Sequence, residues 1–484
     1  MIDTIVLVGY MCVMLWVGWR SRGQTAESYW VANRQYGTRR ISISLVATIL
    51  GASSTIGLIG LGYDRGLTAA WWLLIGAAAL VVFGLVLAAR VRKLGVYTLP
   101  DILQQAYGRM VSVPAALMIV IAWCGIVSAQ MIAGARLLSA ILSIGYTSAL
   151  VIVAVVFILY TFWGGQMSVL KTDVWQLGLF VGGLAICLAF VVVAVQADSS
   201  SILGAVPDGY LSFPVSDSFG WYDLLVFFPL IVGLPYLVGP DIYSRVLCAK
   251  DDSVAQRSVM ISALVVVPIA FMLALLGTLL SGLFPDLVRD AALPTAIREL
   301  VPAGLTGLIA AGFLAAIMSS ADTTLVSAST ILSLNVVGAR KAIPQDRQLA
   351  ITKASVLSVG LVASLIAGFQ QDIISSLLLA YTVFVGGVVL PTLASFYRNS
   401  LRITPQGAMW AVIVGGAAAV VGEIQDGAFL SLVLGDQVTA LLAKALGAGY
   451  RGTLPIILSL IVMMTVSWVG SRSRQQPGSN HIRL

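Results

Sequence analysis

Charged side chains are scarce in this sequence. Asp, Glu, Lys and Arg make up 10% of its 484 residues, while 59% are apolar. Soluble domains are usually about 25% charged, so an ordinary soluble domain is excluded. Repeated apolar runs match the roughly 20 residues that a helix needs to cross a bilayer core. The composition therefore predicts an all-α membrane protein, with the lipid bilayer as its surroundings.

Histidine and cysteine are also rare. The single histidine, His481, lies near the C-terminus, and the four cysteines fall in or beside apolar runs: Cys12, Cys124, Cys187 and Cys248. This spacing indicates neither a disulfide framework nor a metal cluster. A tail histidine cannot supply acid–base chemistry inside a membrane, so we do not expect an enzyme. The first apolar run lacks a basic start and a cleavage site, which argues against a cleavable signal peptide.

About thirteen apolar stretches are candidate spans. They cover roughly 2–19, 41–62, 69–90, 112–142, 148–164, 174–196, 223–243, 256–284, 303–337, 350–369, 373–396, 406–423 and 453–470. An odd number of spans places the two termini on opposite sides of the membrane.

Basic residues predict which side each terminus occupies. Of the 28 Lys and Arg residues, 22 fall in one alternate set of connections, counting Arg245, and five fall in the other set. Because basic loops stay in the cytoplasm, we expect an outside N-terminus and a cytoplasmic tail in a plasma (bacterial inner) membrane. A nucleic-acid-binding stripe would not alternate in this way, so no nucleic acid is expected. The remaining residue, Arg136, lies inside a span, where a structural role is favoured over a functional one.

One apolar span, 41–62, contains residues that weaken a helix. Gly51, Gly57 and the Ser53-Ser54-Thr55 run remove packing and offer the backbone competing hydrogen bonds. An opened helix near the bilayer midplane is how many secondary transporters bind cations. Close packing of two helices through small residues is the alternative.

A second span, 223–243, is interrupted too. Residues 232–240 hold two prolines and two glycines, which a straight helix does not tolerate. If 2–19 is an extra helix, the two breaks lie in the first and sixth core helices. This is the spacing expected of two inverted five-helix repeats, and it favours a transporter.

The span 303–337 contains hydroxyl side chains that could bind a cation. The hydroxyls of Ser319 and Ser320 and the Ala316 carbonyl, together with carbonyls freed at Ala47 and Leu50, would suit a hard cation. The alternative is that both serines bond back to their own helix.

Two carboxylates accompany this span. Asp173 either caps a helix or binds a cation. Asp322 lies deeper and shares a helical face with Ser319. A buried carboxylate needs a cation or a proton, so the pair suggests a second cation site or a release route.

Several motifs in the predicted spans are distinctive. They are AGARL at 133–137, YTFWGG at 160–165, Thr172-Asp173 with Gln176, GPDIYSR at 239–245 followed by AKD at 249–251, and SSADT at 319–323. Together these motifs resemble the sodium:solute symporter family, especially its bacterial proline-permease branch. The resemblance covers about residues 40–420 and implies the LeuT-type five-plus-five fold. The expected organisation is an N-terminal helix and loop (1–40), two repeats (41–196 and 223–398) around an external loop (197–222), two further helices (399–470) and a cytoplasmic tail (471–484).

The resemblance also implies site residues. The common sodium site maps onto Ala47, Leu50, Ala316, Ser319 and Ser320, and a possible second sodium site is made of Asp173, Asp322 and Thr323.

The substrate pocket departs from the family's known patterns, because Ile49 and Val232 replace the acid and tryptophan of proline carriers. Five residues are expected to bind the solute: Ser53, Ser54, Gln130, Tyr236 and Phe384. Leu58 and Trp72 are expected to form an outer lid.

These features predict a secondary transporter. We expect sodium-coupled symport of a small polar solute, with an amino acid or a monocarboxylate favoured. A proton-coupled symporter of the same fold is the first alternative. A membrane sensor is the second, although only about 14 residues follow the last expected span to carry a signal.

Overall fold

The computed structural model describes residues 2–23, 25–197, 202, 204–338, 343–370, 372–423, 431, 435–446 and 450–473, and helices dominate these ranges. The elements are α1 (Ile2–Arg20), α2 (Ala26–Val31), η1 (Ala32–Arg34), α3 (Thr38–Ile49), η2 (Ser53–Gly57), α4 (Leu58–Arg65), η3 (Gly66–Ala70), α5 (Trp71–Val86), α6 (Ala88–Lys93), α7 (Leu99–Tyr107), α8 (Arg109–Leu142), α9 (Tyr146–Ala197), η4 (Asp223–Phe227), η5 (Pro229–Gly233), α11 (Leu234–Val238), α12 (Pro240–Leu247), α13 (Asp252–Leu283), α14 (Arg289–Leu300), α15 (Leu305–Ile331), η6 (Leu332–Val337), α16 (Gln345–Phe369), α17 (Ile373–Phe384), η8 (Val385–Val389), α18 (Leu390–Ser395), α19 (Arg398–Leu401), α20 (Pro405–Glu423), α22 (Asp436–Leu446) and α23 (Tyr450–Ser473). The predicted all-α class is confirmed.

Eleven helices in the described part of the chain are long and apolar enough to cross a membrane. The expected number of about thirteen is therefore not confirmed. The difference arises where one continuous helical stretch holds more than one expected span. In α9, Gly165 adopts φ 55° and ψ −169° between the expected spans 148–164 and 174–196. A straight helix of 52 residues would be about 78 Å long, more than twice a bilayer core.

Both predicted helix interruptions are present. The first follows α3, where Leu50 leaves the helical region at φ −83° and ψ 54°, and helical structure resumes at η2. The second separates α11 from α12 at Gly239, which is extended at φ −60° and ψ 127°. Pro240 opens α12, where a missing backbone donor costs nothing.

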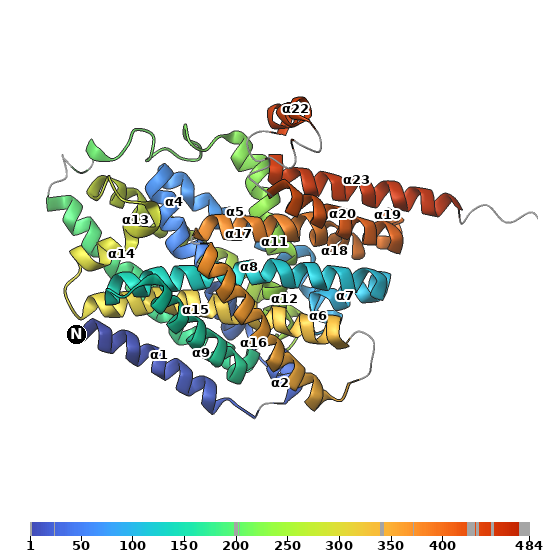
Figure 1. Ribbon diagram of the computed structural model, residues 1–484, viewed down its shortest axis with the longest axis horizontal. Helices are drawn as coiled ribbons and strands as arrows, with labels where there is room; N and C mark the ends of the chain where they lie inside the picture. Colours follow the sequence, from blue (N-terminus) through green and yellow to red (C-terminus); the bar gives the residue numbers. More distant parts are fainter. Residues whose placement is uncertain are drawn as a thin grey trace, which may run out of the picture.

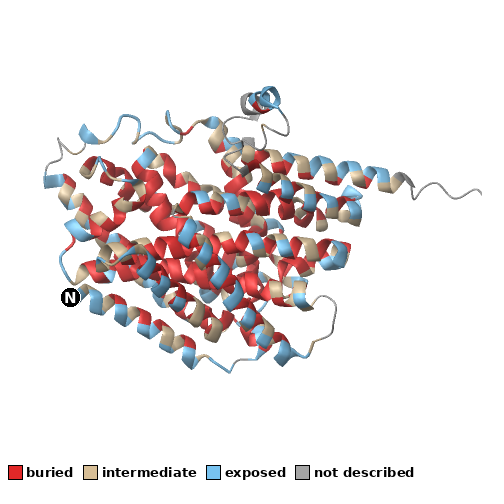
Figure 2. Cartoon of the chain, viewed as in Figure 1, coloured by how far each residue is buried: buried red, intermediate tan, exposed pale blue. Residues whose placement is uncertain are grey.

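Helix α15 forms the centre of the molecule. All residues of its most apolar window are buried, and it packs against α8, α9 and α1. Figure 1 shows α15 and α8 crossing the middle of the view, with α1 and α23 along opposite edges. Buried residues concentrate in this middle region, and exposed residues mark the periphery (Figure 2).

Large apolar side chains cover the periphery. Phe369 is 91% exposed, Trp175 79% and Leu264 74%. Such exposure is unfavourable in water but favourable against lipid. The packing therefore agrees with a multi-pass membrane protein, in which a polar centre is enclosed by lipid-facing helices.

Candidate functional site

The first break is held open by a side chain from another helix. In a continuous helix the Ala52 amide would donate to the Thr48 carbonyl. Here it donates to Gln130 Oε1 on α8 at 2.7 Å. The bond that would close the helix is thereby replaced. Because buried backbone groups need partners in a membrane, Gln130 stabilises the open conformation at the point where the sequence predicts freed carbonyls.

The expected first sodium set lies on two packed helices. Ala47 and Leu50 belong to α3 and its end, and Ala316, Ser319 and Ser320 belong to α15; α3 and α15 are in contact. All five residues are buried. Gly51 lies directly against Ser320, since a Cβ at Gly51 would come within 2.8 Å of Ser320 Cβ. The structure thus brings the broken helix and the serine pair together.

Ser319 does not bond only to its own helix. Its hydroxyl donates to Asp173 Oδ1 on α9 at 2.6 Å. Ser44 on α3 donates to the other oxygen of the same carboxylate. Asp173 is fully buried, eight residues beyond Gly165. The interpretation of Asp173 as a helix cap is therefore wrong, because the helix already begins two turns earlier.

Arg245 also differs from expectation. It was counted with the cytoplasmic connections, but the structure buries it completely in α12. Its guanidinium lies 3.7 Å from Asp173 Oδ2, donates to Thr48 Oγ1 at 3.2 Å and donates to the Thr323 hydroxyl. Its position near the end of an apolar run explains the error. Arg245 joins α12, which follows the second break, to α3, which precedes the first.

Asp322 is the second buried carboxylate. One oxygen accepts a hydrogen bond from Thr161 Oγ1 at 2.8 Å, while Oδ2 is buried without a hydrogen-bond partner among the described residues. Thr323 donates to the Ser319 carbonyl at 2.8 Å. Of the three residues expected at a second sodium site, Asp322 and Thr323 lie on α15 and Asp173 lies on α9, where Arg245 of α12 reaches both Asp173 and Thr323. With two carboxylates beside one guanidinium, either a further cation or a proton would balance the second carboxylate.

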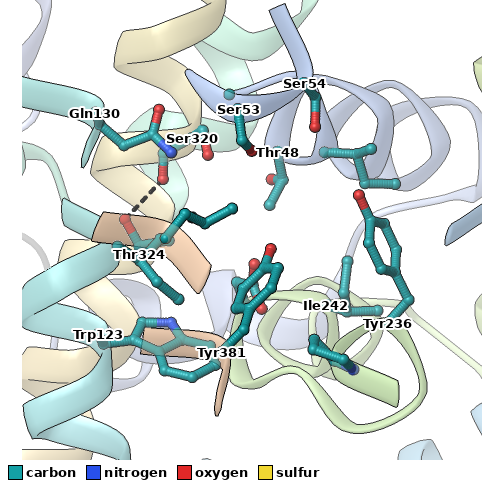
Figure 3. A pocket seen from close by; sticks show the side chains of 16 residues that line it. Thr48, Ser53, Ser54, Trp123, Gln130, Tyr236, Ile242, Ser320, Thr324 and Tyr381 are labelled. Atoms are coloured by element: carbon teal, nitrogen blue, oxygen red, sulfur yellow. Dashed lines mark hydrogen bonds between the residues drawn. The ribbon is translucent and has the colours of Figure 1, made fainter. Parts of the chain in front are cut away.

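A narrow, partly open cavity lies beside these groups, with about 30 Å³ of space that the centre of a water molecule can occupy. Four of the five predicted solute-binding residues line it: Ser53, Ser54, Gln130 and Tyr236. In Figure 3, Ser53 and Ser54 lie on one side, Trp123 and Tyr381 lie on the opposite side, and Tyr236 faces Ser54. Ser320 lies close to Gln130 in the same view, so the cavity adjoins the expected sodium set.

The other pocket predictions lie one layer further out. Phe384 does not line the cavity but packs edge-to-face on Trp123, with ring centroids 4.7 Å apart. Leu58 and Trp72 are buried and are also absent from the lining. Trp72 packs edge-to-face on Phe228 at 5.9 Å. The lid assignment for these two residues stays a prediction.

The lining residues that sequence reasoning missed include Trp123, Asp241 and Tyr381. Asp241 had a signal that was not used: it is an acid next to the Gly239-Pro240 break in an apolar segment. Trp123 and Tyr381 had none, because an aromatic residue in a span is more often packing than ligand.

A second ionic group, here called the Arg289 cluster, joins Arg289, Asp372, Asp64, Asp290 and Arg136. Arg289 Nη2 lies 2.6 Å from Asp372 Oδ2, Nη1 3.6 Å from Asp64 and Nε 3.7 Å from Asp290. Arg136 pairs with Asp290 at 3.2 Å, which agrees with the structural role favoured for it. The cluster links the end of α4 to α14, α8 and the start of α17.

Comparison with known proteins agrees with this geometry. A family model described as the sodium:solute symporter family matches residues 29–415. The chain belongs to the sodium:solute symporter family. The sodium/pantothenate symporter of Escherichia coli is 28% identical and covers 96% of this chain and 95% of that protein. The one from Haemophilus influenzae is 29% identical and covers 64% of this chain and 66% of that protein.

Solved structures confirm the fold. A sodium-coupled sialic acid symporter in an outward-open state superimposes with a TM-score of 0.76 at 19% identity, covering 97% of this chain and 98% of that one. Mhp1 in an inward-facing conformation gives 0.54 at 12% identity, covering 88% and 90%. These are LeuT-fold transporters, so the predicted LeuT-type architecture is confirmed. Family membership makes this chain a membrane transporter, not an enzyme, with sodium as its coupling ion.

Proposed function

We propose that this protein couples inward sodium flow to uptake of a small polar solute, an amino acid or a monocarboxylate. The observation that carries the proposal is the contact between the first break and α15, with Ser320 against Gly51 and Ser319 bonded to Asp173. Oxygen ligands of this kind suit a hard cation. The adjoining cavity, lined by Ser53 and Ser54 hydroxyls, suits a polar solute.

In this proposal sodium bridges α3 and α15 through Ala47, Leu50, Ala316, Ser319 and Ser320. Binding there favours the conformation in which both helices contribute oxygens, and this conformation arranges the cavity for the solute. Opening toward the cytoplasm separates the helices and releases both. A membrane potential supplies about 2.3 kcal/mol per charge per 100 mV, which favours release on the negative side.

A second sodium at Asp173, Asp322 and Thr323 is supported by the unpartnered oxygen of Asp322. We further propose the orientation predicted from the basic residues, with the N-terminus outside, and the two repeats at 41–196 and 223–398. The monocarboxylate class is supported by the sodium/pantothenate relatives, since pantothenate carries one carboxylate. Proton coupling through Asp173 or Asp322 is the competing mechanism.

Uptake into proteoliposomes separates the two couplings. We expect solute accumulation under an inward sodium gradient and none under a proton gradient in sodium-free buffer. Undiminished uptake in sodium-free buffer at low pH would contradict sodium coupling. Absence of accumulation under both gradients would contradict the proposed solute class.

A further inference from the structure

The cavity beside the two breaks is almost neutral. Its lining includes hydroxyl, amide and aromatic side chains, and Asp241 is the one charged residue in the lining as described. The acid expected of proline carriers in the first broken helix is replaced by Ile49. The negative charge of the pocket therefore comes from the second broken helix.

The second break places Asp241 in the wall of the cavity. Gly239 is extended, Pro240 opens α12, and Asp241 follows in its first turn. A Cβ on Gly239 would lie 2.7 Å from Asp241 Oδ1, so the glycine leaves room for this carboxylate. Asp241 is half-buried and lines the cavity.

Asp241 has no ionic partner in the described part of the chain. Arg245, one turn further along α12, pairs with Asp173 instead. A carboxylate at this depth of a membrane protein needs a cation or a proton. Because no basic side chain among the described residues forms an ion pair with Asp241, a cation bound in the cavity would be favoured beside it.

Aromatic rings around the same space favour an organic cation. Trp123, Tyr236 and Tyr381 line the cavity with Asp241, and aromatic faces attract ammonium groups. The Trp123 ring is fixed by Phe384, which packs on it at 73°. Sodium finds a richer oxygen set at Ser319 and Asp173, whereas rings offer it no ligand.

The opposite wall suits an anionic group. Ser53 and Ser54 lie across the cavity from Trp123 and Tyr381 (Figure 3), and their hydroxyls can donate to a carboxylate. Ile242, the neighbour of Asp241, lies toward Tyr381 and Tyr236 (Figure 3). The cavity is therefore lined both by a carboxylate, that of Asp241, and by the hydroxyl donors of Ser53 and Ser54.

We propose that Asp241 binds the ammonium group of the solute, and that this solute is a small zwitterion such as an amino acid or a betaine. This inference rests on the proposed function and narrows it, because a solute carrying only a carboxylate would place like charge beside Asp241. Trp123 and Tyr381 enclose the ammonium, and Ser53 and Ser54 hold the carboxylate.

Uptake by full-length protein in proteoliposomes tests the inference. The probes are proline, γ-aminobutyrate and glycine betaine as zwitterions, and pantothenate and lactate as anions, each with an inward sodium or potassium gradient. We expect sodium-dependent uptake of at least one zwitterion. Asp241→Asn should raise its KM about tenfold or more, since the ion pair between the carboxylate and the ammonium group is lost. Asp241→Glu should restore part of the affinity.

Two further readouts separate recognition from folding. The half-saturating sodium concentration should change less than about twofold in Asp241→Asn, and the exposed Asp208→Asn should match the wild type. A purely structural role would lower the maximal rate for every probe and leave KM unchanged, which would overturn the inference.

The probes also separate this inference from sodium coupling. Sodium-dependent uptake of pantothenate or lactate alone would overturn the zwitterion assignment and leave sodium coupling intact. Zwitterion uptake that depends on Asp241 but not on sodium would support the assignment and contradict sodium coupling. No uptake of any probe would overturn both.

Discussion

The two interrupted helices break for different reasons. The second break is encoded locally, because Gly239 lies between two proline-containing turns that cannot form one helix. The first break contains no proline and depends on distant groups, since Gln130 on α8 takes the Ala52 amide and Ser320 on α15 fills the space beside Gly51. The backbone conformation of the first break therefore depends on side chains of other helices, whereas that of the second does not. A break that depends on neighbouring helices suits a site that must respond to sodium.

The largest effect is expected where α15 meets the first break. Replacing both Ser319 and Ser320 with alanine removes two hydroxyl ligands and the bond to Asp173. We expect the half-saturating sodium concentration for uptake to rise about tenfold or more. Ser329→Ala is the matched control, because Ser329 is a buried serine of α15 whose hydroxyl has no partner in the described structure. Unchanged sodium dependence in the double variant would refute the assignment.

Alanine at the two break glycines should separate sodium effects from solute effects. A Cβ at Gly51 would meet Gln130 Nε2 at 2.7 Å, and a Cβ at Gly239 would meet the Pro235 carbonyl oxygen at 2.5 Å. Overpacking costs about 1–3 kcal/mol. We expect Gly51→Ala mainly to weaken sodium activation and Gly239→Ala mainly to raise the solute KM. Gly178→Ala, with no atom within 4 Å, is the control. Identical kinetic changes in both variants would contradict the comparison.

Removal of the Gln130 side-chain acceptor should destabilise the first break directly. In Gln130→Leu the Ala52 amide loses its partner, and an unsatisfied buried donor costs about 1–3 kcal/mol. We expect the thermal unfolding midpoint in detergent to fall by several degrees. The exposed Gln104→Leu should leave it unchanged. A stable Gln130→Leu protein with normal sodium activation would show that the break does not need this support.

The smallest effect is expected at the Arg289 cluster, which anchors the α4 half of the first broken helix. Burial alone would raise the pKa of Asp372, but hydrogen bonds from Ser375 and Arg289 outweigh it and hold the pKa below its usual value. Because the pKa of Asp372 is lower in the folded than in the unfolded protein, its carboxylate stabilises the folded state at pH values above the unfolded pKa. This stabilisation is lost as the pH falls through the folded pKa. Asp372 is partly exposed, so Asp372→Asn should lower the unfolding midpoint by about one or two degrees at pH 7.

This difference should disappear as the pH falls through the lowered pKa of folded Asp372 and the wild-type carboxylate becomes protonated. A difference that persists unchanged at a pH below this pKa would show that the charge is not responsible.

Local signals account for what the sequence could predict. Glycines and hydroxyl residues predicted the first break, and prolines with glycines predicted the second. The Ser319-Ser320 pair with Asp322 predicted the polar face of α15. Long-range contacts account for what was missed. The Arg245–Asp173 pair joins α12 to α9, and neither residue's burial follows from its position at the edge of an apolar run. Trp123 and Tyr381 meet at the cavity because α8 and α17 pack side by side, and no local sequence pattern specifies this packing.

Sodium binding in the absence of solute is the most direct test of the central claim that sodium lies between the first break and α15. Thermal unfolding of purified protein should be followed while NaCl replaces KCl at constant ionic strength. Binding to the folded state alone raises stability by RT ln(1 + [Na⁺]/Kd). We expect sodium to raise the unfolding midpoint of the wild type and of Ser329→Ala, but not that of the Ser319→Ala/Ser320→Ala variant. Equal stabilisation of all three proteins would contradict the proposed site.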